Sequence, residues 1–519
     1  MSIIRAALCA ALSIFSLAGL VHAQDVTLSA RDGQIEIHGT LLGFDGEFYR
    51  IDTDYGELTV DGSGVLCAGP GCPNLQNYVA QVALSGADTI GRLLLPALLQ
   101  GFAQRNGYRM DFKQTDATHL LITLTERATN KKAAEFSIRL TNTDEGFADL
   151  LANEADIVLA RREIRPEEHR RAAEAGMGDM SGNNRSRVLA LDALVPIVAP
   201  GNPVRFIDPQ DLARVFAGEI VNWQRLGGPD APIALHMLGA ESGLAQAMDD
   251  LLMAPADLFL APQVVQHVRG QELTLAVAND PFALGLASFS DVGNGQALAL
   301  RGVCGRVLRA TRRTIKTEDY PLTAPMFLYL PARRLPKVAR EFLNFARGPL
   351  AQITVRRAGL VDQATEEIPP AVQGDRFANA ILAADAETDL AKIQVMTGYL
   401  TDMRRLSLAF RFEAGTARLD AQSRSNVQYL ARALEQGRYD GRALHFVGFS
   451  DGDGSSETNQ EIALERAEAV RLAVRDTAET ADFDQIVMEA RAYGEAMPLA
   501  CDENAWGRQT NRRVEVWVR

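Results

Sequence analysis

The feature that most constrains the fold of this chain is a long alternation of two apolar patterns between about residue 78 and residue 365. Short strand-like runs, such as YVAQVALSG and ALVPIVAP, alternate with longer helix-like runs, such as IGRLLLPALLQGFAQRNG. Strand and helix patterns that alternate in this way predict an α/β domain. The segments on either side of this central region have different patterns.

The segment before it predicts a small all-β module over residues 24–75. Short alternating runs are separated by RDG, FDGE and DYGE, which are signals of hairpin turns. Cys67 and Cys72 bracket the tight turn AGPG, and in an oxidising compartment they are predicted to form a disulfide that closes the module. A metal site is the alternative, but no second cysteine or histidine pair lies nearby to complete it. Whether Cys304 pairs with Cys501 stays open.

Residues 1–23 predict a cleaved secretory signal peptide. Arg5 precedes an apolar run that ends at Val21-His22-Ala23, a typical cleavage pattern. The run is too short and wrongly flanked for a membrane-spanning helix, and no later segment reaches the roughly 18 apolar residues that a span requires. We therefore expect an exported, soluble protein.

The chain is acidic, with a net charge of −13, and loss of Arg5 with the signal (−13 − 1) leaves −14. This charge makes nucleic acid and anionic membrane surfaces unfavourable partners. The sequence contains no G-x-S-x-G, H-E-x-x-H or P-loop motif, and its seven histidines show no metal spacing. We therefore predict neither an enzyme nor a bound cofactor or metal. The charged run ARREIRPEEHRRA is predicted to be a solvated helix face.

The last part of the chain, from about residue 406, predicts a second α/β unit. Alternating apolar residues in LSLAFRF predict a strand, and ALHFVGF, QIVMEARAYG and RRVEVWV predict three more. Asp420 can cap a helix after the first strand. A second helix contains Arg466. Its inward face is predicted to consist of Leu464, Ala467, Val470 and Val474.

Two opposite charges stand out in this unit. Asp451 lies in the glycine-rich loop GFSDGDGSSETNQ, and Arg466 follows fifteen positions later in the helix. A carboxylate and a guanidinium could hold the ammonium and the carboxylate of one small zwitterion, with backbone N–H groups at the helix start adding to anion binding. A structural salt bridge, or two solvated charges, is the alternative that spacing alone leaves open.

Residues 406–519 resemble the OmpA-like peptidoglycan-binding domain. The matching pieces are FEAGTARLD (412–420), GFSDGDGSSETNQ (448–460), Arg466-Ala467, Tyr493-Gly494 and NRRVEV (511–516). The resemblance implies that Asp451 and Arg466 grip the diaminopimelate of the peptidoglycan stem peptide. It also assigns Asn459 and Arg512 to the site. Ile462-Ala463 and Ser450 depart from the family pattern, but both charges remain.

Residues 78–365 resemble the phosphate-binding proteins of ABC uptake systems, which are type 2 periplasmic binding proteins. Similar pieces include LSGADTIGRLLLPALLQGFAQRNGY (84–108), DEGFADLLANEADIVLARREIRPEE (144–168), DLARVFAGEIVNWQRLGG (211–228) and ESGLAQAMDDLL (241–252). The resemblance implies two α/β lobes, two crossovers and a ligand cleft between the lobes.

The same resemblance implies an anion site in the cleft, because phosphate sites need many hydrogen-bond donors and usually an arginine. By position, the candidates are Ser85, Thr89, Arg161, Ser242 and Gly243. Each hydroxyl taken alone could instead cap a helix. Ala160 and Leu244 stand where the family has hydroxyl donors, and each lost donor costs roughly 1–3 kcal/mol of binding free energy. The cleft could therefore hold another oxyanion, a small polar metabolite or nothing.

The predicted order is a signal peptide (1–23), the β module (24–75), the binding-protein-like domain (76–365), a linker with a helical segment (366–405) and the OmpA-like domain (406–519). The predicted function is that of an exported envelope protein, periplasmic and associated with the cell wall or outer membrane. It would bind peptidoglycan and capture a small oxyanion such as phosphate, with an ABC permease or another envelope protein as candidate partner. The alternative is a structural or sensory envelope protein whose binding-protein fold contacts a partner protein. The role of the β module is not predicted.

Overall fold

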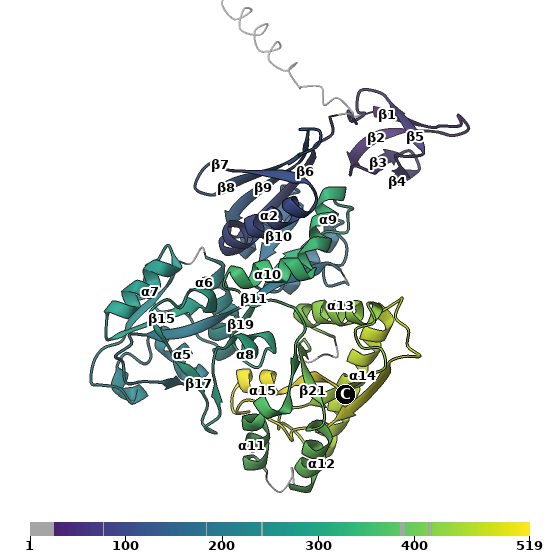
Figure 1. The fold of residues 1–519 in the computed structure, drawn as a ribbon. Coiled ribbons are helices and arrows are strands. Elements are labelled where there is room, and N and C mark those ends of the chain that lie inside the picture. The colour runs from purple at the N-terminus through teal and green to yellow at the C-terminus, as the bar shows by residue number, and fades with distance from the viewer. Residues whose placement is uncertain are drawn as a thin grey trace, which may run out of the picture.

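The fold was analysed in a computed structural model, which describes residues 25–75, 77–182, 184–239, 242–384, 390–413, 416 and 418–519. The predicted signal peptide lies outside the described residues. The described chain forms a small β module at one end, a two-lobed central domain and a C-terminal domain that packs beside both lobes (Figure 1). None of the described helices has the length and the apolar character that a bilayer crossing requires.

The N-terminal module is all-β, as predicted, and its sheet has five antiparallel strands. Its strands are β1 (Asp25–Ala30), β2 (Glu36–Phe44), β3 (Phe48–Thr53), β4 (Gly56–Asp61) and β5 (Val65–Ala68), in the order β4-β3-β2-β1-β5. Its core is small, and the predicted Cys67–Cys72 disulfide is confirmed beside that core.

The first lobe of the central domain packs helices on a mixed sheet. Its strands are β6 (Ala80–Ala87), β7 (Tyr108–Gln114), β8 (His119–Glu126), β9 (Lys132–Thr141) and β10 (Ile157–Ala160). Its helices are the π-helical turn η1 (Ile90–Leu94), α2 (Leu95–Arg105), α3 (Thr143–Leu151), α4 (Pro166–Glu174), α9 (Lys337–Ala346) and α10 (Pro349–Arg357).

The second lobe has shorter strands and its own core. Its strands are β12 (Phe206–Ile207), β13 (Ala234–Leu238), β14 (Val265–His267), β15 (Ala283–Ser288), β16 (Gln296–Ala297), β17 (Ala299–Arg301) and β18 (Val307–Leu308). Its α-helices are α5 (Pro209–Phe216), α6 (Gly243–Met248), α7 (Gly270–Asn279) and α8 (Arg312–Lys316), and π-helical and 3-10 turns (Asp249–Met253, Ala254–Ala256) extend α6.

Two long strands connect the lobes. The first part of β11 (Ser186–Val198) pairs with β19 (Thr323–Tyr329), and the residues from Leu194 onward pair with β15 of the second lobe. The sheet therefore continues from β7 through β10, β19 and β11 to β14. This arrangement gives the two lobes and two crossovers that the resemblance implied.

The C-terminal domain is a sheet in the order β20-β21-β24-β22-β23 with helices on both faces. Its strands are β20 (Glu367–Ile368), β21 (Arg404–Phe410), β22 (Ala443–Phe449), β23 (Val487–Ala492) and β24 (Arg513–Val518). Its helices are α11 (Gly374–Leu382), α12 (Leu390–Leu400), α13 (Ala421–Glu435), α14 (Ser456–Thr477) and α15 (Ala505–Asn511).

The segment predicted as a linker is part of this domain in the structure. β20 pairs with β21, and α11 and α12 share a core with the inward residues Val447, Phe449 and Trp517 of the sheet. The apolar residues of both helices cover the sheet face opposite α13 and α14, so the domain has two cores. A Pro/Gly/acidic stretch suggested a linker because it is polar, but the helices after it are amphipathic.

One predicted helix face is corrected. The inward residues of α14 are Ala463, Ala467, Val470 and Val474, whereas Leu464 is 44% exposed. At 100° per residue around the helix axis, positions 463, 467, 470 and 474 fall within one narrow stripe, and position 464 lies outside it. The larger side chain of Leu464 suggested the wrong register.

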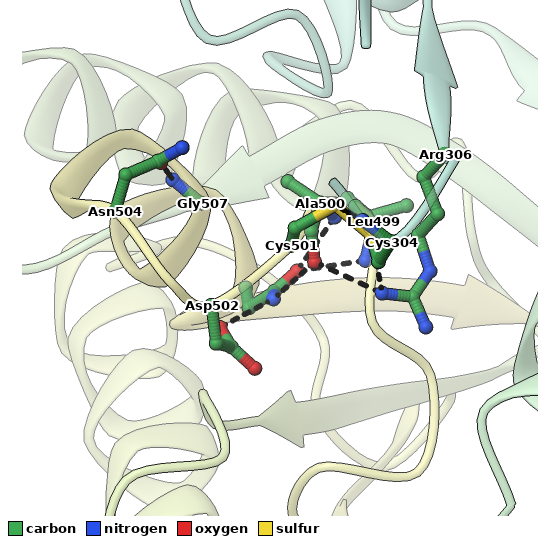
Figure 2. The surroundings of a disulfide bond; sticks show 9 residues. Cys304, Arg306, Leu499, Ala500, Cys501, Asp502, Asn504 and Gly507 are labelled. Carbon is green, nitrogen blue, oxygen red and sulfur yellow. Dashed lines mark hydrogen bonds between the residues drawn. A yellow bond between two sulfur atoms is a disulfide. The ribbon is translucent and has the colours of Figure 1, made fainter. Parts of the chain in front are cut away.

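The C-terminal domain is fastened to the second lobe by a disulfide that the sequence left open. Cys304 pairs with Cys501, 197 residues later (Figure 2). Arg306 donates to the Ala500 carbonyl at 3.3 Å beside it. Trp506 of α15 joins the core of the second lobe, and its Nε1 donates to the Leu251 carbonyl at 2.6 Å.

Candidate functional site

The predicted anion site lies where both lobes touch. A Cβ atom added to Gly243, the first residue of α6, would lie 2.8 Å from Arg161 Cγ and 3.1 Å from Ala87 Cβ. Arg161 follows β10 and Ala87 ends β6, so elements of both lobes meet at this glycine. The absent side chain allows this close approach.

Arg161 is buried and already paired. Its Nη2 donates to Asp192 Oδ2 at 3.0 Å, and the side chains are 1% and 0% exposed. Asp192 also accepts from Ser288 Oγ at 2.6 Å. Arg161 Nε is buried and has no hydrogen-bond partner within the described part of the chain. The site therefore holds a neutralised ion pair with one donor that is not used.

The three predicted hydroxyls have other positions. Ser85 donates to the carboxylate of Asp149, which also accepts from Arg139. Ser242 caps α6 by accepting from the Ala245 N–H at 3.1 Å, which is the helix-cap alternative. Thr89 is half-buried before η1 and makes no side-chain capping bond. Of the five candidates, Arg161 and Gly243 lie in direct contact in this arrangement.

The predicted zwitterion site begins with Asp451, in the loop after β22. Asp451 is buried, and its Oδ2 lies 3.0 Å from Arg512 Nη1. Its neighbours are fixed by backbone bonds, since Ser450 N–H donates to the Gly494 carbonyl at 2.9 Å and Gly452 N–H donates to Asp502 Oδ2 at 3.1 Å. Asp502 directly follows Cys501 of the interdomain disulfide (Figure 2). The hydrogen bond from Gly452 therefore links the Asp451 loop to the segment that carries this disulfide.

Arg466 lies in the middle of α14 and not at its start. It is ten residues after Ser456, which corresponds to about 15 Å along the helix axis, so the helix N-terminus does not act on its guanidinium. The guanidinium carbon lies 5.4 Å from the centre of the Phe412 ring. Burial lowers the pKa of Arg466, the charge of Arg512 lowers it further, and Asp451 opposes both effects.

No hydrogen bond or salt bridge of Arg466 is found with the residues that the structure describes. Asn459 is buried and donates to Glu495 Oε2 at 3.3 Å, so it ties the first turns of α14 to the segment after β23. Asp451, Arg466 and Arg512 thus form one electrostatic group, and Asn459 supports its frame. The guanidinium of Arg466 is a half-buried cation that no carboxylate within the described part of the chain pairs with directly.

Known proteins match the two α/β units separately. A model of the PBP superfamily domain matches residues 78–348, which is more than half of the chain, and the OmpA family matches residues 411–512. The chain belongs to the PBP superfamily. This family consists of binding proteins, and here a PBP domain is fused to an OmpA domain.

Curated relatives match the PBP domain. Protein SphX of Synechococcus elongatus is 24% identical over 286 residues, which cover 51% of this chain and 81% of SphX. The phosphate-binding protein PstS of Borreliella burgdorferi is 24% identical over 183 residues, which cover 34% of this chain and 65% of PstS.

Solved structures match both units. An ABC-type phosphate transport receptor from Vibrio cholerae has a TM-score of 0.42 and 18% identity, over 54% of this chain and 99% of that one. The peptidoglycan-associated lipoprotein from Burkholderia pseudomallei has a TM-score of 0.19 and 26% identity, over 21% of this chain and 89% of that one.

Sequence reasoning missed the partner of Arg161. Asp192 is the single charge in the buried run VLALDALVPIV of β11, and a lone carboxylate in an apolar strand signals a buried pair.

The prediction that the run ARREIRPEEHRRA is a solvated helix face is only partly correct. Arg161 and Arg162 are buried before α4 begins at Pro166, and the exposed part is the helix that follows.

Proposed function

We propose that the OmpA domain binds peptidoglycan by gripping a zwitterionic residue of the stem peptide, such as diaminopimelate. The observation that supports this proposal is the half-buried guanidinium of Arg466, which has no carboxylate partner among the described residues. An arginine of this kind gains a charge-assisted, bidentate bond when a ligand carboxylate arrives. Asp451, held by its loop beside Arg512, would receive the ammonium.

Peptidoglycan pull-down tests the clamp. Asp451→Ala and Arg466→Ala should each weaken binding severely, by about 2–5 kcal/mol, because each leaves a partly desolvated charge of the ligand or protein unpaired. The double variant should lose little more, since either change breaks the same clamp. Arg475→Ala, in the last turn of the same helix, is the matched control and should bind like the wild type.

Competition tests which charges matter. Free diaminopimelate should displace the wall, and lysine, which lacks the second carboxylate, should compete less well. If both single variants still sediment with peptidoglycan like the wild type, the two charges are only part of a surface network.

For the PBP domain, we propose capture of a small oxyanion, with phosphate as the first candidate. Arg161 Nε, buried and without a partner in the described chain, supports this proposal. The relative PstS is a phosphate-binding protein, which makes phosphate the first ligand to test here. The ion would enter when the contact at Gly243 opens.

Thermal unfolding with added anions tests this second proposal. Phosphate or sulfate should raise the melting temperature by mass action. Arg161→Lys should reduce the rise, and Arg170→Lys on the exposed part of α4 should not. No rise with any millimolar oxyanion would favour the rival function, in which the PBP domain contacts a partner protein as a structural or sensory subunit.

The combined proposal is an exported protein of the cell envelope that is held at the wall by its OmpA domain. An ABC permease is the partner that solute capture would require. Cell fractionation should place the protein in the periplasm with the wall fraction, and Arg466→Ala should release it to the soluble periplasmic fraction.

A further inference from the structure

A cavity of about 390 Å³ lies between the PBP domain and the OmpA domain. Its walls come from both lobes, from the crossover near β19 and from the start of α13 and α15. This volume falls in the range of small-molecule sites, which are roughly 300–1,000 Å³. Neither the clamp at Arg466 nor a family match to one domain accounts for a cavity that both domains build.

One end of the cavity is lined by two buried arginines, each already paired with a carboxylate. The side chains of Arg161 and Arg162 are 1% and 4% exposed, and the Nε atom of each is buried without a hydrogen-bond partner in the described chain. Arg162 is fixed by Glu168 at 2.6 Å and by Asp144. Its Nε lies 3.7 Å from Asp250 Oδ2, beyond hydrogen-bond distance. Two rigid guanidinium groups therefore retain a donor each.

The other end is lined by the carboxyl groups of Glu163, Glu318 and Asp420. Glu163 Oε1 accepts from the Ala421 N–H at 2.9 Å, at the first residue of α13, and Asp420 caps the same helix. Glu318 accepts from Asn426 Nδ2 at 3.4 Å. Burial, together with the nearby charge of Asp420, raises the pKa of both glutamates to about 8.

Two arginines neutralise this end only in part. Arg411 donates to the backbone carbonyls of Gln509 and Thr510, and its Nε lies 3.9 Å from Glu318 Oε2. Arg424 donates to the Leu419 carbonyl and to Glu413. Burial is the first cause of the raised pKa of both glutamates and the charge of Asp420 adds to it, whereas Arg424 at Glu163 and Arg411 at Glu318 oppose it only in part.

The cavity also offers an unused acceptor and an apolar wall. Gln422 is buried, and its Oε1 has no partner within the described residues. The Trp506 ring is fixed by its bond to Leu251 and lines the cavity with Tyr320. Buried polar atoms without partners are costly, so a ligand or ordered water that satisfied them would stabilise the site.

We infer that this cavity binds a small zwitterion, an amino acid or a dipeptide, with its ammonium at Glu163, Glu318 and Gln422 and its carboxylate at the Nε atoms of Arg161 and Arg162. The inference goes beyond the proposed function, because the OmpA domain supplies part of the binding site. Since both proposed ligands use Arg161 Nε, the zwitterion and the oxyanion exclude each other. A ligand held by both domains stabilises their contact.

The experiment uses the full chain with Asp451→Ala and Arg466→Ala, so that the wall site cannot bind the probes. Calorimetric titration with the standard amino acids and a set of neutral dipeptides should find at least one that binds one to one and raises the melting temperature. The N-acetyl form and the amide of that probe lack one charge each, and each should bind at least tenfold more weakly.

Variants locate the site. Glu163→Gln keeps the size and the acceptor for Ala421, and it should weaken zwitterion binding at least tenfold while any response to phosphate stays unchanged. Glu167→Gln, exposed on α4, is the matched control. Gln422→Leu gives a second test within the OmpA domain. The inference is wrong if no probe binds, or if the probe that binds is insensitive to Glu163→Gln and Gln422→Leu; loss of the phosphate response alone would contradict only the oxyanion proposal.

Discussion

The PBP domain is attached to its two neighbours in different ways. The β module meets it mainly through partly exposed charges: Glu47 bonds Arg340 at 2.6 Å and Lys337 at 3.1 Å, and these side chains are 31–54% exposed. One carboxylate of this contact, Asp45, is buried and pairs with Arg334. The OmpA domain meets it through buried groups. Arg405 of β21 forms two bonds with Asp319, at 2.7 and 2.9 Å, and its side chain is 2% exposed.

The difference shows which domain is integral to the binding-protein core. Exposed ion pairs stabilise little, because salt screens them and ordering both side chains costs entropy. We call the contact between the OmpA domain and the PBP domain the OmpA joint. It combines a buried ion pair, a disulfide and the Trp506 contact. It also reaches the first lobe, where Arg347 donates to Gln428 at 2.6 Å. The OmpA domain therefore braces both lobes, whereas the β module is an appended unit.

The largest expected effect comes from breaking the buried pair of the OmpA joint. Asp319→Ala leaves Arg405 buried with half of its carboxylate contacts, which should lower the free energy of unfolding by about 3–5 kcal/mol. Urea unfolding followed by circular dichroism measures it. Lys337→Ala at the β-module joint is the control and should change stability much less. Equal effects of the two changes would remove the distinction between the joints.

The two disulfides sharpen the comparison. Cys304→Ser with Cys501→Ser opens a loop of 197 residues and should cost about 2–4 kcal/mol, because a long loop gains much entropy when it is released. Cys67→Ser with Cys72→Ser opens a separation of 5 residues and should cost less. Calorimetry should place the first effect in the main transition and the second in the β module alone. A larger effect of the short disulfide would contradict this assignment.

Raising the pH should weaken the OmpA joint. The pKa of Glu163 and Glu318 is about 8 in the folded protein against 4.5 in the unfolded chain, so the folded state holds more protons between these values. The stability that they contribute is complete below about pH 4.5 and is lost as pH rises toward 8, by up to about 1.4 kcal/mol per unit for each group. Melting temperatures from pH 5 to 8 should fall less steeply in Glu163→Gln. An unchanged slope would argue that Glu163 is ionised throughout.

The smallest effect is expected at the β-module joint. Hydrogen bonds from Arg340 and Lys337 hold the pKa of Glu47 near 2, so its charge persists across the usual range. Glu47→Ala should leave the main melting transition unchanged, because the removed contacts are solvated. Limited proteolysis between the module and β6 should become faster. A main transition that falls as far as in Asp319→Ala would show that this joint is also integral.

Much of the candidate wall site could be predicted from the sequence. The Asp451 loop and the Arg466 helix follow from local patterns, and the structure places their charges in one group with Arg512. The anion site was less predictable. Ser85 and Ser242 have the right positions in the chain, but neighbouring groups from their own lobes take up their hydrogen bonds.

The sequence by itself determined the strands, the helices, the cap at Asp420 and the short disulfide, because these depend on residues close together in the chain. Only the tertiary structure decided that Cys304 meets Cys501, that Arg161 pairs with Asp192 and that α11 and α12 belong to the last domain. It also decided that the two domains enclose a cavity between Glu163 and Trp506. Such contacts join residues tens to hundreds of positions apart, and burial, which no local pattern encodes, selects them.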